Sequence, residues 1–332
     1  MGYNDIISRT DLDAGTMVPP EISKEVIKEA PKNSVVLSRA RRVPMSAKVR
    51  VQPVLNSFPI AYWVNGDIGL KQTTKQQWGN LSITAEELAA IVVIPDSLVD
   101  DANIPLWPEV QPYLVEAIGL KVDQAALFGV DKPASWPAGI VPAAIAAGNT
   151  VEYGAGKDLA QDVALLGERL AAQGYPIGTF ASQPGLEWRL RQLRSQDGVP
   201  IYGQPLAQGQ PATLFGLPLN PVENGAWDTE SALLAAVDWR KYVIGVRQDI
   251  TWKWFSEGVI SDDEGKVVVN LMQQDSKALR VVFRVGFQVA NPINRLQADG
   301  YPAGVVVPAV PVAPAVIVTT PGGQASRNYT VA

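Results

Sequence analysis

Residues 33–78 are the part of the sequence that most restricts the possible folds. This stretch contains seven basic side chains and one acidic side chain, although the formal net charge of the whole chain is −5. Alternating apolar and polar residues at both ends are typical of strands, whereas Gly66, Gly69 and Gly79 interrupt the pattern. The sequence therefore predicts a long two-stranded excursion with a polar, basic middle. The seven basic residues are Arg39, Arg41, Arg42, Lys48, Arg50, Lys71 and Lys75.

The chain contains no Cys and no His, which excludes many functional classes. Disulfide frameworks, thiolate or imidazole metal sites, Cys nucleophiles and His-based triads all need one of these residues. Only Asp, Glu, Lys, Ser, Thr, Tyr and Arg remain for chemistry, and we expect no cofactor. The length of 332 residues predicts about two domains at ~150 residues each.

The charge balance limits the kinds of partner. With 28 basic against 33 acidic residues, the chain is not a polycation, so any DNA contact must be a local patch. No signal peptide opens the sequence, and the longest uncharged apolar stretch, 303–318, is interrupted by three prolines. We therefore expect no membrane association. Nine Trp residues suit large buried contacts within or between subunits.

The sequence patterns at the two ends of the chain are not typical of a compact domain. Residues 1–34 have the pattern of an arm with a short amphipathic helix over 21–29. Residues 299–327 carry no charge between their ends and are rich in Pro, Val and Ala, which predicts an extended tail outside any core.

Between these ends, periodicity predicts a mixture of helices and strands. The longest helix is expected over 109–128, with Pro112 in its first turn and Leu114, Ile118, Val122 and Ala125 forming its apolar stripe. Further helices are expected near 96–102, over 159–174 and over 186–194, the last capped by Ser182. Strands are expected at 88–94, 212–215, 231–237, 241–246, 250–255, 267–269 and 279–289.

Candidate catalytic motifs are weak. Residues 153–158 lack the first Gly and the Ser/Thr of a phosphate loop, which favours a helix-entry loop. The acids at 262–264 suit a solvated hairpin turn, and Asp96, Asp100 and Asp101 suit turn and capping roles. We therefore predict that the chain is not an enzyme. For the basic stretch, a solvated face and an intersubunit or nucleic-acid contact are equally favoured.

The order of several short motifs resembles the major capsid proteins of tailed double-stranded DNA bacteriophages, the Hong Kong 97 type. No single motif is specific, but nine occur in the family's order between residues 17 and 296. They are Val18-Pro-Pro-Glu-Ile22, Trp63-Val64, Val93 to Asp101, Ala125 to Gly129 with Pro137 to Ile140, Ser182-Gln-Pro184, Asp197-Gly198, Thr213 to Pro218, Arg284-Val-Gly-Phe287 and Asn291-Pro292.

The resemblance implies an α+β fold of the Hong Kong 97 type and a division of the chain into six parts. It also implies a role for Lys71, Lys75 and Trp78 as extended-loop contacts, and it makes Arg39, Arg41, Arg42, Lys48 and Arg50 candidates for intersubunit or DNA-facing contact. The six parts are an N-terminal arm (1–45), an extended loop (46–85), a peripheral domain with a long spine helix (86–137), an axial domain (138–245), returning strands (246–296) and a Pro/Val-rich tail (297–332).

By the same resemblance, the protein is expected to self-assemble into pentamers and hexamers of an icosahedral virion capsid. Its expected partners are other copies of itself, packaged double-stranded DNA, a portal, and separate scaffolding and decoration proteins, with assembly in the host cytoplasm. The alternative is a prokaryotic nanocompartment shell, similar to encapsulins, that encloses cargo enzymes.

Two departures from the family pattern carry expectations of their own. The pattern begins at residue 17, so we expect no N-terminal scaffolding segment. Some members join subunits by an isopeptide bond between Lys and Asn, assisted by Glu. The positions matching that Asn and Glu are Asp275 and Val282, so we predict no autocatalytic cross-linking.

Overall fold

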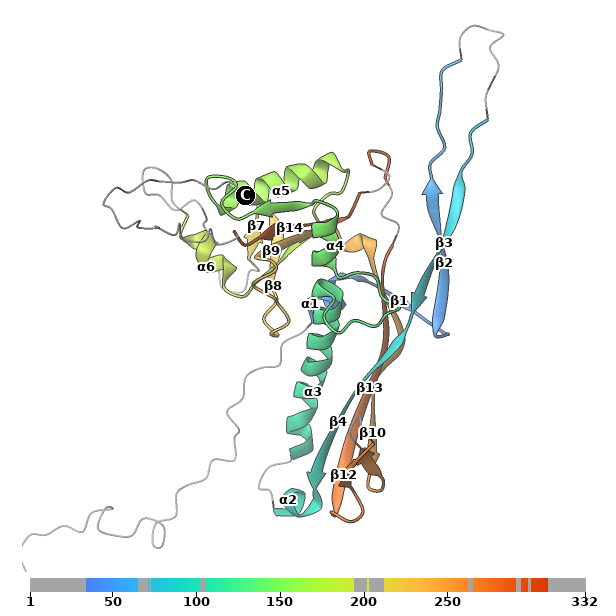
Figure 1. Ribbon diagram of the computed structural model, residues 1–332, viewed down its shortest axis with the longest axis vertical. Helices are drawn as coiled ribbons and strands as arrows, with labels where there is room; N and C mark the ends of the chain where they lie inside the picture. The colour runs from blue at the N-terminus through green and yellow to red at the C-terminus, as the bar shows by residue number, and fades with distance from the viewer. Residues whose placement is uncertain are drawn as a thin grey trace, which may run out of the picture. The chain divides into compact units, whose positions relative to one another are not determined.

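A computed structural model describes residues 34–64, 71, 73–101, 106–193, 202, 212–261, 265–290, 294–297 and 300–309. The helix expected over 21–29 and the acidic turn at 262–264 lie outside these residues. The chain divides into two compact units (Figure 1). The first contains Met1–Pro137, Glu223–Ala226 and Arg240–Asn291, and the second contains Ala138–Val222, Trp227–Trp239 and Pro292–Ala332.

A four-stranded sheet in the order β1-β10-β13-β4 forms the framework of the first unit. The strand β1 is parallel to β10, and the other neighbours are antiparallel. Two strands expected separately, 241–246 and 250–255, are one strand, β10, because a bulge between Val246 and Thr251 shifts the register without ending the pairing. The strands are β1 (Arg41–Pro44), β4 (Glu86–Pro95), β10 (Tyr242–Phe255) and β13 (Ser276–Val289).

The long helix α3 (Leu106–Asp123) lies along β4 and continues as a π-helical turn, η1 (Gln124–Phe128) (Figure 1). The predicted stripe is confirmed, because all four of its residues are buried. The predicted start was wrong: the helix begins at Leu106, so Pro112 lies in its interior, where it removes one backbone hydrogen bond. Short helices are α1 (Val35–Arg39) and α2 (Asp96–Asp101), the second as expected.

The basic excursion is a hairpin that forms a sheet of its own. Strands β2 (Val49–Ser57) and β3 (Gln77–Thr84) pair antiparallel, which confirms the two-stranded prediction. A second small hairpin joins β11 (Val259–Ser261) to β12 (Val267–Asn270).

The second unit is built on a six-stranded sheet in the order β5-β14-β9-β6-β8-β7. Helices α4 (Ile140–Ala146) and α5 (Leu159–Ala172) contact β14, and α6 (Leu186–Arg191) contributes Leu186 and Leu190 to the same core as α5. The strands are β5 (Thr150–Glu152), β6 (Thr179–Ser182), β7 (Thr213–Leu214), β8 (Leu217–Pro221), β9 (Leu234–Val237) and β14 (Ala303–Val307).

The position of β14 corrects the prediction for the C-terminal segment. Residues 303–307 were expected to lie outside any core, but they form a buried strand between β5 and β9. Val305 and Val306 have no exposed surface. A Val run buried on both faces does not alternate, and Pro302 and Pro308 lie just outside the strand, where a proline removes no ladder hydrogen bond.

Of the two predictions for the segments that precede α5 and α6, one is confirmed and one is wrong. Residues 153–158 form a helix-entry loop, as predicted: the Asp162 carboxylate accepts hydrogen bonds from the backbone N–H groups of Gly154 (2.8 Å) and Gly156 (2.6 Å). The predicted cap of α6 was wrong, because Ser182 is the last residue of β6 and the helix is preceded by Gly185 at φ 77°.

Candidate functional site

The five basic candidates lie on consecutive elements of the first unit, and all five are exposed. Arg39 is in the last turn of α1, and Arg41 and Arg42 are on β1 at the edge of the four-stranded sheet. Arg42 Nε donates to the carbonyl oxygen of Leu37 at 2.9 Å. This bond fixes the short turn from α1 into β1.

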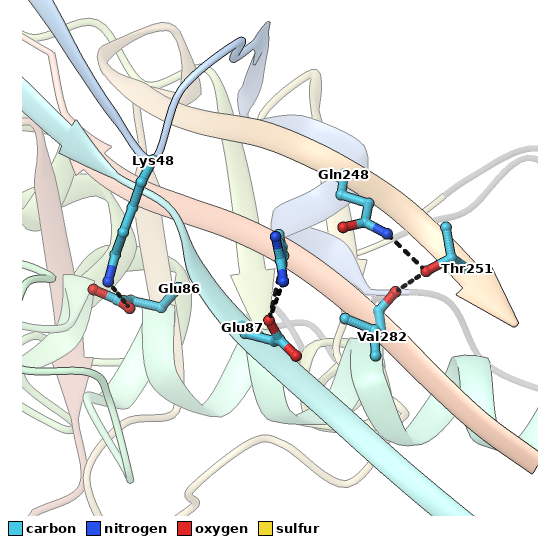
Figure 2. Close-up of polar contacts among 7 residues, drawn as sticks. Lys48, Glu86, Glu87, Gln248, Thr251 and Val282 are labelled. Atoms are coloured by element: carbon cyan, nitrogen blue, oxygen red, sulfur yellow. Dashed lines mark hydrogen bonds and ion pairs between the residues drawn. The ribbon is translucent and has the colours of Figure 1, made fainter. Parts of the chain in front are cut away.

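The other two candidates lie where the chain enters the β2–β3 hairpin. Lys48 Nζ is 3.5 Å from Glu86 Oε2, and Arg50 Nη1 donates to the Pro44 carbonyl at 2.5 Å. Figure 2 shows the pair of Lys48 with Glu86. Lys48 and Arg50 therefore make contacts within the subunit, and these contacts fix how the chain enters the hairpin.

The hairpin exposes apolar side chains that its own subunit does not cover. Trp63 is 98% exposed and Trp78 is 67% exposed, and Lys71 and Lys75 are also exposed. An isolated two-stranded ribbon is marginally stable in water at best. The exposed Trp rings are therefore suited to contact with a partner.

The base of the hairpin is firmly anchored. Ile83 of β3 has no exposed surface and packs with Met45 and Val243 in a small core. Gln288 Nε2 of β13 donates to the carbonyl oxygen of Ser82 at 3.1 Å. The ribbon thus has a rigid base on the sheet and exposed apolar residues beyond it.

A buried carboxylate, Asp123 at the end of α3, holds the start of α1. It accepts hydrogen bonds from Ser34 Oγ (2.6 Å), Val35 N (3.1 Å) and Val36 N (3.0 Å), which fixes the N-terminus of α1. Asn224 Nδ2 donates a fourth bond at 2.7 Å. Burial raises the pKa of Asp123 above its usual value, and these hydrogen bonds lower it by less.

A hollow of about 270 Å³ opens on one face of the four-stranded sheet. Arg284 donates to Glu87 Oε2 from Nε (2.9 Å) and Nη2 (2.6 Å), and Thr251 links Gln248 to the Val282 carbonyl (Figure 2). The residues that line the hollow are Glu87, Gln248, Thr251, Trp252, Lys253, Arg280, Val282 and Arg284.

Asp275 and Val282 occupy the positions of the Asn and Glu in the cross-linking family members, and they lie in different surroundings. Val282 lines the hollow and is 8% exposed. Asp275 adopts a left-handed conformation (φ 43°), and its carbonyl oxygen accepts a hydrogen bond from Asp96 N at 2.8 Å. The absence of cross-linking stays a prediction.

The residue patterns did not single out Asp123 or the hollow. A useful signal for Asp123 was present, because it is an acid directly after Val122 in the buried stripe of α3. The hollow forms because β10 and β13 pair in one particular register, and local sequence patterns do not predict that register.

Other kinds of site find no support among the residues that the structure describes. No group of three or more acidic side chains in these ranges is arranged to hold a metal ion. Within the same ranges, no helix is both long and apolar enough to span a membrane.

Comparisons with known proteins place the chain in a family. Residues 14–296 match the model of the phage capsid family. A solved structure from Microbacterium phage Oxtober96 is 33% identical, with a TM-score of 0.81 over 92% of this chain and 100% of that chain. One from Mycobacterium phage Cain is 32% identical, with a TM-score of 0.80 over 92% and 99% of the two chains.

More distant structures share the fold. The capsid of a native GTA particle, computed with C5 symmetry, is 18% identical, with a TM-score of 0.68 over 92% of this chain and 100% of that chain. No curated protein matches the sequence. Because the family model covers most of the chain, the chain belongs to the phage capsid family and is a structural, non-enzymatic protein of an icosahedral phage shell.

Proposed function

We propose that the protein forms the pentamers and hexamers of the shell, with each β2–β3 hairpin lying on a neighbouring copy. The observation that carries this proposal is the exposure of Trp63 and Trp78 on a ribbon with a rigid base. A neighbouring copy would cover these rings and would supply the apolar burial that the ribbon lacks.

The same proposal gives roles to the parts of the chain. Residues 1–45 act as an arm, 46–85 as the extended loop, 86–137 as the peripheral domain and 138–245 as the axial domain. Residues 246–296 act as strands that return through the peripheral to the axial domain. The strand at 303–307 belongs to the core of the second unit, so the tail proper begins after it. Residues that follow this strand are proposed to reach a neighbour or a decoration protein.

The basic candidates are assigned to contacts between subunits. Arg39 and Arg41 are exposed and precede the hairpin in the chain, so a neighbour that covers the hairpin is proposed to contact them as well. Charge reversal at Arg41 should weaken assembly at low salt, and added salt should relieve part of this loss by screening the new repulsion. If assembly and packaging stay unchanged at all salt concentrations, this assignment is wrong.

We infer further that the shell encloses double-stranded DNA, carries a portal and assembles in the host cytoplasm. Non-covalent contacts hold it together, since Asp275 and Val282 replace the cross-linking pair. Boiled, denatured particles should run as a single monomer band, and a ladder of covalent oligomers would contradict this. A nanocompartment shell is not favoured, because the family match is to phage capsids.

Hairpin contact between copies is tested by cysteine labelling, since the chain has no Cys of its own. A Trp63→Cys variant should react with a maleimide dye as free subunits and be protected in assembled particles. Met272→Cys, at a residue that is 74% exposed on another segment, serves as the matched control for labelling. Equal reactivity of Trp63→Cys in both states would overturn the proposed hairpin contact.

A further inference from the structure

The hollow on the four-stranded sheet contains an unusual pair of like charges. Lys253 on β10 and Arg280 on β13 are directly opposite each other in the antiparallel register. Both cations lie over the ring of Phe255, at 5.0 Å for Lys253 Nζ and 4.8 Å for Arg280 Cζ. Like charges directly opposite each other repel, and the ring of Phe255 attracts both cations without neutralising them.

No described carboxylate of the same chain neutralises this charge. Among the residues in the structure, no carboxylate forms an ion pair with Lys253 or Arg280, and the carboxylate of Glu87 is held by Arg284. Arg280 Nε is buried and has no hydrogen-bond partner among these residues. A buried donor without a partner costs about 1–3 kcal/mol. The hollow is therefore lined by two cationic side chains that no described carboxylate pairs, as an anion site requires.

We propose that this hollow binds a carboxylate side chain from a second copy of the chain. The site is concave and has a volume of about 270 Å³, and Trp252 and Val282 form apolar parts of its wall. Because Lys253 and Arg280 both line the hollow, a single carboxylate that entered it would lie near both cations. Duplex DNA, in contrast, is contacted by cations that protrude toward its phosphates.

The composition of the chain supports a second copy as the source of the carboxylate. Acidic residues outnumber basic residues by 33 to 28, so each copy has carboxylates beyond those that its own bases can pair. This inference rests on the proposed assembly of the shell, which brings other copies against each subunit.

Carbodiimide coupling tests the proposal in assembled particles. This reagent joins an amine to a carboxylate in direct contact without adding a spacer, so it would link Lys253 to its partner acid. Particles are assembled from a mixture of ¹⁴N- and ¹⁵N-labelled subunits, and cross-linked peptides are identified by mass spectrometry. We expect a Lys253–Asp or Lys253–Glu peptide in which the two isotopes are mixed.

Two controls make the result specific. Lys277 Nζ is 3.2 Å from Asp96 Oδ1 of the same chain, so their cross-linked peptide should be isotopically pure. The Lys253→Arg variant keeps the positive charge and removes the amine, so particles should form and the mixed peptide should be lost.

Three outcomes would overturn the proposal. In particles verified by electron microscopy, Lys253 could couple only within its own copy, or it could fail to couple. It could also be protected from acetylation in DNA-filled particles but not in empty shells, which would assign the hollow to DNA. In each case the particles themselves still support the shell, so failure of this inference is distinct from failure of the proposed function.

Discussion

Gly245 on β10 and Gly286 on β13 lie directly opposite each other and together leave room for the base of the β2–β3 hairpin. A Cβ atom on Gly286 would be 2.6 Å from the Thr84 carbonyl oxygen and 3.0 Å from Ile83 Cγ2. A Cβ atom on Gly245 would also meet Ile83 Cγ2 at 3.0 Å. The absence of two side chains is thus what allows β3 to approach the sheet.

Gly286→Ala should therefore destabilise the subunit. The new methyl group meets backbone rather than a flexible side chain, so we expect a loss of about 1–3 kcal/mol in the free energy of unfolding. Guanidinium titration of unassembled subunits measures this change. Gly167→Ala, in the interior of α5 with its nearest neighbour at 3.5 Å, is the matched control and should be stabilising by about 0.5–1 kcal/mol. Equal effects at the two positions would show that β3 does not depend on this close approach.

Asp123→Asn should destabilise the first unit by about 1–3 kcal/mol. The amide nitrogen of Asn is a donor and would face at least one of the donors that now point at the carboxylate, among them Val35 N, Val36 N and Asn224 Nδ2. Ser34→Ala removes two hydrogen bonds, the one that Ser34 Oγ donates to Asp123 and the one that it accepts from Leu37 N. It keeps the charge and leaves no new donor facing the remaining donors, so it should have a smaller effect. Chemical denaturation of the two variants gives this ranking, and the reverse order would contradict it.

The pH dependence of stability gives a separate test of Asp123. Because the folded-state pKa is raised, the folded state binds more protons than the unfolded state above the usual value of 3.8. The contribution of Asp123 is therefore fully present below that value and is lost as the pH rises through the folded-state pKa. The stability advantage of the wild type over Asp123→Asn should thus shrink between acid and neutral pH. An advantage that grows over this range would mean that the folded-state pKa is lowered instead.

Replacing the exposed Trp residues of the hairpin should weaken assembly and leave folding of the subunit almost unchanged. Trp63→Ala and Trp78→Ala should change subunit stability by less than about 0.5 kcal/mol, since both rings are exposed in the subunit. Each should weaken assembly by about 1–3 kcal/mol per contact, measured as a higher protein concentration needed for particles to form. Trp239→Ala is the contrast: this Trp is 5% exposed and its Nε1 donates to Thr179 Oγ1, so its loss should unfold the second unit. Normal assembly of both hairpin variants would exclude these rings from the interface.

Two truncations should distinguish the core strand β14 from the segment that follows it. A chain that ends after Ala309 keeps the whole strand, including the Val307 carbonyl that accepts a hydrogen bond from Tyr153 N at 2.9 Å, and should fold normally. A chain that ends after Leu296 exposes the edges of β5 and β9 and should be insoluble or protease-sensitive. Limited proteolysis and circular dichroism measure both outcomes. Equal stability of the two chains would show that β14 adds nothing to the fold.

The comparison of sequence and structure shows which features are encoded locally. The buried stripe of α3 and the helix at 159–172 could be predicted, because 3.6-residue periodicity reports directly which side of a helix is covered. The strand at 303–307 could not, because a short Val run between prolines has the same composition in a loose tail and in a central strand. The hollow with Lys253 and Arg280 requires a register between strands about 30 residues apart.

The hairpin was predicted correctly as a two-stranded excursion, since alternation at its ends and glycines in its middle are local signals. The sequence did not show which groups the basic side chains near the hairpin contact. The structure shows that Lys48 forms an ion pair with Glu86, whereas Arg42 and Arg50 donate to backbone carbonyls and keep their full charge.

Electron microscopy of the full-length chain, purified without other phage proteins and concentrated at low and high salt, tests the central claim most directly. The account predicts pentamers, hexamers, closed shells or tubes, and it predicts that Trp63→Ala combined with Trp78→Ala reduces them while the subunits stay folded. A wild-type chain that stays monomeric at every concentration and salt, and whose monomers are folded, would contradict it.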